Sequence, residues 1–205
     1  MLGSLPEHIY SIAPDGVYVN LFEPSTLEWQ HVGTTVQWKM TTQFPLQPEV
    51  SLQVSAAQSV PAKIRIRVPG WAAREMPIYV NGTLTATGKP GTYAMIERTW
   101  SDKDAITFTL PIAFRLTPYT GADQTANARR YGLEYGPILM AVIGSPKTAL
   151  QVKGGHYAED LLGQISAKPG APLHFQIEHN PDVELMPYWK VDQETFTCLP
   201  VVQVT

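Results

Sequence analysis

Residues 62–82, AKIRIRVPGWAAREMPIYVNG, constrain the fold of this chain more than any other stretch. Apolar residues at 64, 66 and 68 alternate with basic residues at 63, 65 and 67, the period-2 pattern of a strand with one buried and one solvated face. Pro69-Gly70 ends that strand. The alternation resumes at Ile78 and Val80 and runs into Asn81-Gly82, a pair that tolerates positive φ at both central positions of a type I′ turn. We therefore expect residues 62–82 to form a β-hairpin in a chain built of strands.

Five more stretches before residue 118 have the alternation of strands. They are residues 17–22, 35–40, 50–55, 92–100 and 105–110, the last two linked by a polar turn at 101–104. Residues 1–13 suit only the end of an amphipathic helix, through Leu2, Leu5, Ile9 and Tyr10. The 18 prolines break up any long helix, so we expect little helix after residue 13. Eight or so strands are enough for a complete antiparallel sandwich.

A second strand-rich block follows residues 119–130, which are small and polar without a period and read as a linker or long loop. Strands are expected within 133–143, 173–177, 183–189 and 195–204, with a loop at 152–170. We predict an all-β protein of two antiparallel β-sandwich (jelly-roll-like) units. The first is 1–118, after a short N-terminal remnant, and the second, smaller one is 131–205.

The composition of the chain argues against some classes of binding partner. A chain of 205 residues buries about 70% of its unfolded surface and needs no disulfide or metal for a core. The net charge of -3, with scattered Lys and Arg, gives no footprint for nucleic acid or an anionic membrane, and no run reaches the roughly 18 apolar residues of a membrane span. We expect neither partner. MLGSLPEHIY lacks the basic start and apolar core of a signal peptide, which favours the cytoplasm but says nothing of a longer parent.

Carboxylate pairs are the first catalytic candidates, because glycoside hydrolysis needs two of them facing one bond. Asp102 and Asp104 are close in sequence, but both fall in the expected turn, where a conformational role outweighs a catalytic one. Glu23, Glu97 and Glu134 lie in or beside strands, and the sequence does not show whether any two converge.

Metal ligands are equally sparse. His174, Glu178 and His179 form the only cluster, and on a strand 174 and 178 share a face while 179 points away. Surface polar residues on an edge strand are the favoured interpretation. Cys198 is the only cysteine, which excludes an intrachain disulfide or a cysteine-based zinc cluster and favours a buried, inert thiol.

Aromatic side chains are the remaining binding candidates, because the C–H face of a sugar ring stacks on Trp or Tyr. Trp71, just after a Pro-Gly strand end, suits a loop contact, although packing in the core or at a domain interface is favoured over it. Tyr119, Tyr131 and Tyr135 are further candidates for contacting carbohydrate.

Several stretches together resemble the C-terminal part of glycoside hydrolase family 127, the group typified by β-L-arabinofuranosidases. They are SLPEHIYSIAPDGVYVNLFEPSTLEW, IRIRVPGWA followed by IYVNG, GTYAMIERTWSDKDAITFTLP, YGLEYGPILMA and VELMPYWKVDQETFTCLPVV. None is specific alone, but their order and spacing span nearly the whole chain.

The resemblance implies an (α/α)6 barrel elsewhere that holds the active site, with a cysteine nucleophile at a zinc site of Cys and Glu ligands. The Cys-Cys pair of that family lies just upstream of the segment that resembles SLPEHIY. No residue of this chain matches the nucleophile, the zinc ligands or the acid/base, and Cys198 does not correspond to that pair. We therefore expect no catalytic or metal residue here, and zinc only in the missing barrel.

The resemblance thus predicts a non-catalytic β-sandwich portion of a family 127-like hydrolase that is inert alone. It would brace the barrel, in cis or in trans, and mediate a homodimer, with an apolar contact face near Leu2, Leu5, Ile9 and the Trp71 loop. An alternative is a free-standing carbohydrate-binding module for a plant-type glycan, using Trp71 or the tyrosines near 119–135. A third hypothesis, an autonomous glycosidase, lacks an identifiable carboxylate pair.

Overall fold

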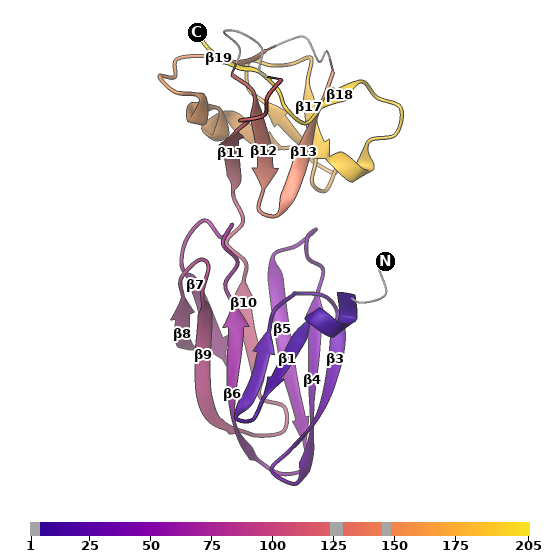
Figure 1. Ribbon diagram of the computed structural model, residues 1–205, viewed down its shortest axis with the longest axis vertical. Coiled ribbons are helices and arrows are strands. Elements are labelled where there is room, and N and C mark those ends of the chain that lie inside the picture. Colours follow the sequence, from indigo (N-terminus) through magenta and orange to yellow (C-terminus); the bar gives the residue numbers. More distant parts are fainter. Residues whose placement is uncertain (1–4, 124–128, 145–148) are drawn as a thin grey trace. The chain divides into compact units, whose positions relative to one another are not determined.

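The computed structural model describes residues 5–123, 129–144 and 149–205, and the chain divides into two compact units, Met1–Ile112 and Ala113–Thr205 (Figure 1). Unit 1 contains η1 (Leu5–His8), β1 (Tyr10–Ala13), β2 (Gly16–Val19), β3 (Ser25–His31), β4 (Thr34–Thr42), β5 (Glu49–Ala56), β6 (Val60–Arg67), β7 (Met76–Val80), β8 (Thr83–Gly88), β9 (Tyr93–Trp100) and β10 (Ala105–Thr109). Unit 2 contains β11 (Phe114–Pro118), β12 (Tyr131–Tyr135), β13 (Ile138–Ile143), β14 (Leu150–Val152), η2 (Ala158–Gln164), β15 (Ile165–Ala167), β16 (Phe175–Ile177), β17 (Glu184–Pro187), η3 (Tyr188–Lys190), β18 (Phe196–Thr197) and β19 (Val202–Val204). The all-β prediction is confirmed. None of the helices in these ranges is long and apolar enough to cross a membrane.

Unit 1 is a sandwich of two sheets, one in the order β1-β2-β6-β9 and the other in the order β3-β4-β5-β10-β7-β8. Side chains of both sheets share one core, in which Trp38 of β4 packs edge-on against Trp100 of β9 with ring centroids 5.0 Å apart. Along β4, Val36, Trp38 and Met40 are buried while the residues between them are exposed, as the alternation predicts.

The Asn81-Gly82 turn is confirmed, but the hairpin that it closes differs from the expected one. Asn81 and Gly82 have φ of 51° and 80°, and Val80 lies opposite Thr83, so a two-residue turn joins β7 to β8. The expected pairing within 62–82 is wrong, because β6 belongs to the four-stranded sheet and β7 to the six-stranded one. After Pro69-Gly70 the chain crosses between the sheets instead of folding back.

Replacing Gly82 by valine is expected to lower the free energy of unfolding of unit 1 by about 1–2 kcal/mol, because a β-branched residue resists positive φ. A Cβ atom added at Gly82 would meet no other described atom within 4 Å, so the cost comes from the backbone and not from a clash. The midpoint of urea denaturation measures it. Leu84→Val, at an exposed position of β8, is the matched control, and an unchanged midpoint for Gly82→Val would contradict the turn argument.

The β2–β6 ladder is parallel, an exception to the antiparallel prediction. A Cβ at Gly16 would lie 1.8 Å from the carbonyl oxygen of Lys63, so only glycine permits this approach of the two backbones. Arg65 donates two hydrogen bonds, of 3.1 and 2.8 Å, to the carboxylate of Asp15, and Lys63 lies 3.3 Å from it. The Arg65 hydrogen bonds are the main reason that the pKa of Asp15 falls to about 2. These contacts fix β2 against β6.

Unit 2 is built on a sheet in the order β11-β12-β13-β17-β16-β15, with β18 also paired to β13. Its core lies between that sheet and a parallel two-stranded ladder, β14–β19, which packs with η2. The loop expected at 152–170 therefore contains regular structure, η2 and β15. Leu161 is fully buried and holds η2 on the core, with Ala158 and Leu162 packed partly buried beside it.

The division of the chain falls between Ile112 and Ala113, whereas the sequence placed the end of the first unit at residue 118. Strand β11 pairs with β12 along its whole length, which puts it in unit 2. Of the linker expected at 119–130, residues 124–128 lie outside the described ranges, and the linker stays a prediction.

From residue 5 on, the N-terminal stretch forms the 3-10 turn η1 and then strand β1, where the end of an amphipathic helix was expected. Tyr10 begins β1 and pairs with Val19 of β2. Ile9 is buried in the core of unit 1, so it is not part of an exposed contact face. Leu2 and the side chain of Leu5, the other apolar residues expected there, lie outside the described part of the structure.

Candidate functional site

Trp71, the carbohydrate candidate in unit 1, is half-buried at the margin of the core. Its ring stacks parallel to that of Phe44, with centroids 6.0 Å apart, and it packs against the core cluster. One face of the indole is thus engaged by the protein, as the core-packing interpretation requires.

The three tyrosine candidates of unit 2 have different surroundings. Tyr131 and Tyr135 lie four residues apart on β12 and share one face of it. Tyr131 is only 7% exposed, and Tyr135 packs against Phe114 and Phe175, with burial raising the pKa of its phenol. Their rings serve the core of unit 2.

Tyr119 is held by polar partners. Its hydroxyl donates a 2.6 Å hydrogen bond to Asp123, and the Arg130 guanidinium lies over its ring, 4.7 Å from the centroid. The hydrogen bond to Asp123 is the main cause of the raised pKa of Tyr119. A contact with sugar at any of the four aromatic positions stays a prediction.

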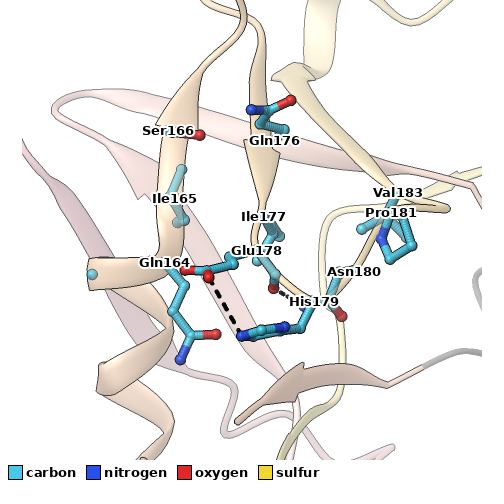
Figure 2. Close-up of a pocket in the computed structure, with 11 residues that line it drawn as sticks. Gln164, Ile165, Ser166, Gln176, Ile177, Glu178, His179, Asn180, Pro181 and Val183 are labelled. Atoms are coloured by element: carbon cyan, nitrogen blue, oxygen red, sulfur yellow. Dashed lines mark hydrogen bonds and ion pairs between the residues drawn. The ribbon is translucent and has the colours of Figure 1, made fainter.

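Unit 2 has a pocket of about 470 Å³ between the end of η2, β15, β16 and the turn that follows β16 (Figure 2). Glu178 and His179 lie at this turn, with His179 Nε2 3.5 Å from Glu178 Oε1 and the His179 backbone at a φ of 62°. The side-chain oxygen of Gln164 is buried and lacks a hydrogen-bond partner in the described structure. These groups offer an imidazole, a carboxylate and an amide oxygen to a small polar ligand.

The same pocket does not provide the pair of carboxyl groups that a glycosidase needs. Glu178 is the one carboxyl-bearing residue among the described residues that line it. The side chain of Asn180 makes hydrogen bonds that maintain the fold. Its Oδ1 accepts from the backbone N–H of Gln151, and its Nδ2 donates to the backbone carbonyl groups of Gln151 and Glu178. The pocket therefore lacks the two-carboxylate arrangement of a glycosidase.

The His174, Glu178 and His179 cluster is not brought together. His174 Nδ1 lies 2.6 Å from Glu184 Oε1, and the other oxygen of Glu184 is 2.7 Å from Lys168 Nζ. His179 instead contacts Glu178, beyond the other end of β16. Within the described ranges, no group of three His, Cys, Asp or Glu side chains is placed to hold a metal ion.

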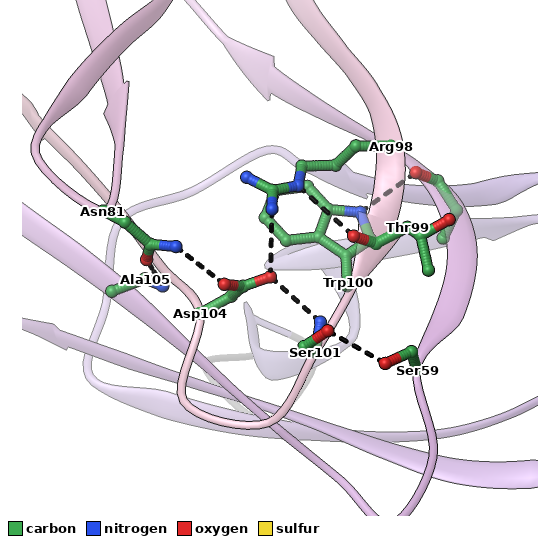
Figure 3. A network of polar contacts seen from close by, with 9 residues as sticks. Ser59, Asn81, Arg98, Thr99, Trp100, Ser101, Asp104 and Ala105 are labelled. Carbon is green, nitrogen blue, oxygen red and sulfur yellow. Dashed lines mark hydrogen bonds and ion pairs between the residues drawn. The ribbon is translucent and has the colours of Figure 1, made fainter.

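Four of the five carboxylates that were catalytic candidates, all except Glu23, contact polar groups of the protein. Glu134 accepts hydrogen bonds from Arg115 and Thr117, and Glu97 lies 3.6 Å from Lys63. Asp104 is 9% exposed and accepts from the Ser101 amide and the Asn81 side chain (Figure 3).

The pKa shifts of the carboxyl groups also give no support to a glycosidase active site. A glycosidase general acid needs a raised pKa, and each carboxyl group of the described chain whose pKa departs clearly from its usual value is shifted downward. They are Asp15, Asp104, Asp123, Asp160, Glu184 and Glu194. For Glu184 the hydrogen bonds from Lys168 and then His174 are the main causes. Burial raises the pKa of the Cys198 thiol, which lowers its thiolate fraction and hence its nucleophilicity.

Sequence reasoning missed three surface features. The pocket of unit 2 depends on η2, which no period revealed. Tyr188 and Trp189 of η3 are each about half exposed, with rings edge-to-face at 5.6 Å. The outer face of the six-stranded sheet of unit 1 has a groove lined largely by the polar residues of the alternating strands. In the sequence, those residues served only to identify the buried residues between them.

Comparison with protein families gives one match. Residues 16–112 match the family described as "Beta-L-arabinofuranosidase, GH127 middle domain". The match ends at the residue where unit 1 ends. It supports the resemblance to glycoside hydrolase family 127 noted above, and the placement of the chain in the C-terminal part of that family stays a prediction. The comparison with curated proteins gives no match.

Solved structures of glycosidases share the fold of this chain. A GH127 β-arabinofuranosidase matches with a TM-score of 0.73 at 17% identity, over 98% of this chain and 37% of that one. A GH127 β-L-arabinofuranosidase from Geobacillus stearothermophilus T6 matches with a TM-score of 0.67 at 20% identity, over 98% and 36%. A further structure, named only as a glycoside hydrolase, matches at 0.70 and 15% identity, over 96% and 37%. At these identities the likeness is one of fold, and the chain spans little more than a third of each of these relatives.

Proposed function

We propose that this chain is the non-catalytic β-sandwich portion of a GH127-like glycoside hydrolase. The observation that carries the proposal is the match of residues 16–112 to the GH127 middle domain, over the span of unit 1 from β2 onward. The fold of both units is found within the glycosidases compared above, where it makes up little more than a third of the chain. Unit 2 is proposed as the C-terminal part of the same assembly.

The partner in this proposal is an (α/α)6 catalytic barrel, joined in cis or associating in trans, which the β-units brace. A homodimer is a further part of the proposal. The exposed rings of Tyr188 and Trp189 support a contact role for η3, because exposed aromatic residues are enriched in protein interfaces.

Zinc is assigned to the barrel, because the residues of this chain do not fit a zinc–thiolate site. Cys198 lies in the segment between β18 and β19, and burial raises its thiol pKa, whereas a metal-bound cysteine is a thiolate.

Purified chain is expected to release no product from an aryl β-L-arabinofuranoside, even with zinc and a thiol reductant, because the pocket of unit 2 offers one carboxyl group, that of Glu178, where a glycosidase of the two-carboxylate type needs two. The measurement is a chromogenic assay across a gel-filtration profile, with a GH127 enzyme as the positive control. Turnover that follows the protein peak would overturn the assignment to a non-catalytic portion, and the substitution of Cys198 by alanine would then show whether that thiol takes part.

The bracing role has its own test. The DNA upstream of the Met1 codon is read for a segment that encodes a Cys-Cys-containing barrel, and that segment is produced alone and together with this chain. We expect the barrel to become soluble and active only with the chain present. A barrel that is equally active alone would contradict bracing.

A further inference from the structure

The outer face of the six-stranded sheet of unit 1 has a groove of about 580 Å³, floored by β4, β5, β10 and β7. One row of directly opposed residues crosses it: Thr41 faces Ser51, Ser51 faces Thr107, and Thr107 faces Tyr79. Opposed residues share a face of the sheet, and neighbouring strands lie about 4.8 Å apart, so this row spans about 14 Å. The groove thus has a line of three aliphatic hydroxyl groups that ends at an aromatic ring.

These four polar groups have no hydrogen-bond partner within the described residues, unlike the hydroxyl groups that maintain the fold nearby. Thr42, adjacent in sequence but pointing the other way, donates to the Glu49 carbonyl at 2.9 Å and accepts from the Phe44 amide at 3.0 Å. Thr42 fixes the wall of the groove, whereas the row across its floor leaves its hydrogen-bonding capacity for a ligand.

The lining has little charge. Glu49 is the single charged residue among the described residues that line the groove, and the rest are hydroxyl, amide or apolar side chains. The Tyr79 side chain is 37% exposed, enough to present part of its ring. Hydroxyl groups beside a ring and threonine methyl groups complement a ligand with both apolar C–H faces and many hydroxyl groups.

We propose that this groove binds a short neutral oligosaccharide, with Tyr79 stacking on one sugar ring and Thr41, Ser51 and Thr107 bonding the hydroxyl groups of the chain. The site goes beyond the proposed function, because a domain that braces a barrel needs no ligand of its own. None of the four aromatic residues that the sequence offered as sugar contacts is among its described lining residues.

Two other ligand classes fit the groove less well. A peptide that adds a strand needs a free sheet edge, but β4, β5, β10 and β7 each have a neighbour on both sides, and the edges are β3 and β8. Nucleic acids and acidic glycans need cationic side chains, and the charged lining residue is a carboxylate.

The test is an amide-shift titration of the full chain by NMR with arabinotriose and xylotriose, and with trigalacturonate as the charged comparison. We expect the neutral sugars to shift the amides of Thr41, Ser51, Thr107 and Tyr79. Tyr79→Ala should raise the dissociation constant for these sugars roughly tenfold. Thr107→Val keeps the side-chain shape, removes the hydroxyl group and should weaken binding by a smaller factor.

Tyr93→Ala is the matched control, since Tyr93 is also exposed but lies on β9 of the other sheet. It should leave binding unchanged, and the denaturation midpoints of all variants confirm folding. If neither neutral sugar shifts the groove amides, if binding survives Tyr79→Ala, or if trigalacturonate binds more tightly, the proposal is wrong. None of these results bears on the barrel assay, so this proposal can fail separately from the proposed function.

Discussion

Substituting Trp100 by alanine is expected to lower the free energy of unfolding of unit 1 by about 3–5 kcal/mol, the range for removing a large aromatic residue from a core. Trp100 is fully buried at the end of β9, where its ring meets that of Trp38 across the two sheets. Its indole nitrogen donates a 3.0 Å hydrogen bond to the Ala62 carbonyl of β6. The substitution therefore leaves a cavity between the sheets and an unpaired carbonyl group.

Urea denaturation followed by far-UV circular dichroism measures the loss. Trp189→Ala is the matched control, because that tryptophan is 50% exposed and should cost little. Trp100→Phe separates the packing contribution from that of the hydrogen bond. Phenylalanine keeps much of the aromatic packing but lacks the indole N–H, and the lost hydrogen bond should cost about 1 kcal/mol in addition to the reduced packing. If Trp100→Ala left the midpoint unchanged, the core described for unit 1 would be wrong.

Replacing Asp104 by alanine is expected to destabilise unit 1 by about 3 kcal/mol, because it removes two hydrogen bonds to a buried, charged acceptor. The Asp104 carboxylate accepts from the Asn81 side chain at 2.7 Å and the Ser101 amide at 2.9 Å, and Arg98 lies 3.5 Å away (Figure 3). It thereby links the β9–β10 turn to the β7–β8 turn. Asp102→Ala, at an exposed position of the same turn, is the matched control and should cost under about 1 kcal/mol.

The contribution of Asp104 should also depend on pH. Burial raises the pKa of this carboxyl group, but the Ser101 amide, Asn81 and Arg98 together outweigh it, so the pKa lies below its ordinary value. A group with a lowered folded-state pKa stabilises fully above its unfolded pKa, about 3.9, and loses that contribution as pH falls through the folded value. The stability gap between the unmodified chain and Asp104→Asn should therefore narrow from pH 6 to pH 3. A constant gap would contradict this linkage.

Local alternation predicted the strands of unit 1 well because each has one buried and one solvated face. It could not predict which strands pair. The alternation at 64–68 and at 78–80 is the same whether the two strands form one hairpin or lie in different sheets, and only the packing around the crossing decides. β3 was missed: none of the predicted stretches covers Ser25–His31, and Trp29 is the one buried residue of that strand.

Unit 2 was harder because its strands are short and its core is completed by η2 and the β14–β19 ladder. A three-residue strand is too short to establish a period. The candidate sites show the same limit. Aromatic residues are easily found in a sequence, but only the structure shows whether a ring such as that of Tyr131 is buried or can contact a ligand. The groove with Thr41, Ser51 and Thr107 forms only when β4, β5 and β10 are aligned in one sheet.

The parallel β2–β6 ladder has a consequence for the order of events as the ribosome makes this chain. Val17 lies opposite Ile64, so β2 must wait for about 50 further residues before its partner exists, whereas β3, β4 and β5 pair with immediate neighbours. The β3-β4-β5 meander can therefore form during synthesis, while β2 stays unpaired on its β6 side. When β6 finally pairs with β2, the Lys63 carbonyl group packs directly against Gly16. Glycine permits this contact because it has no side chain in that place.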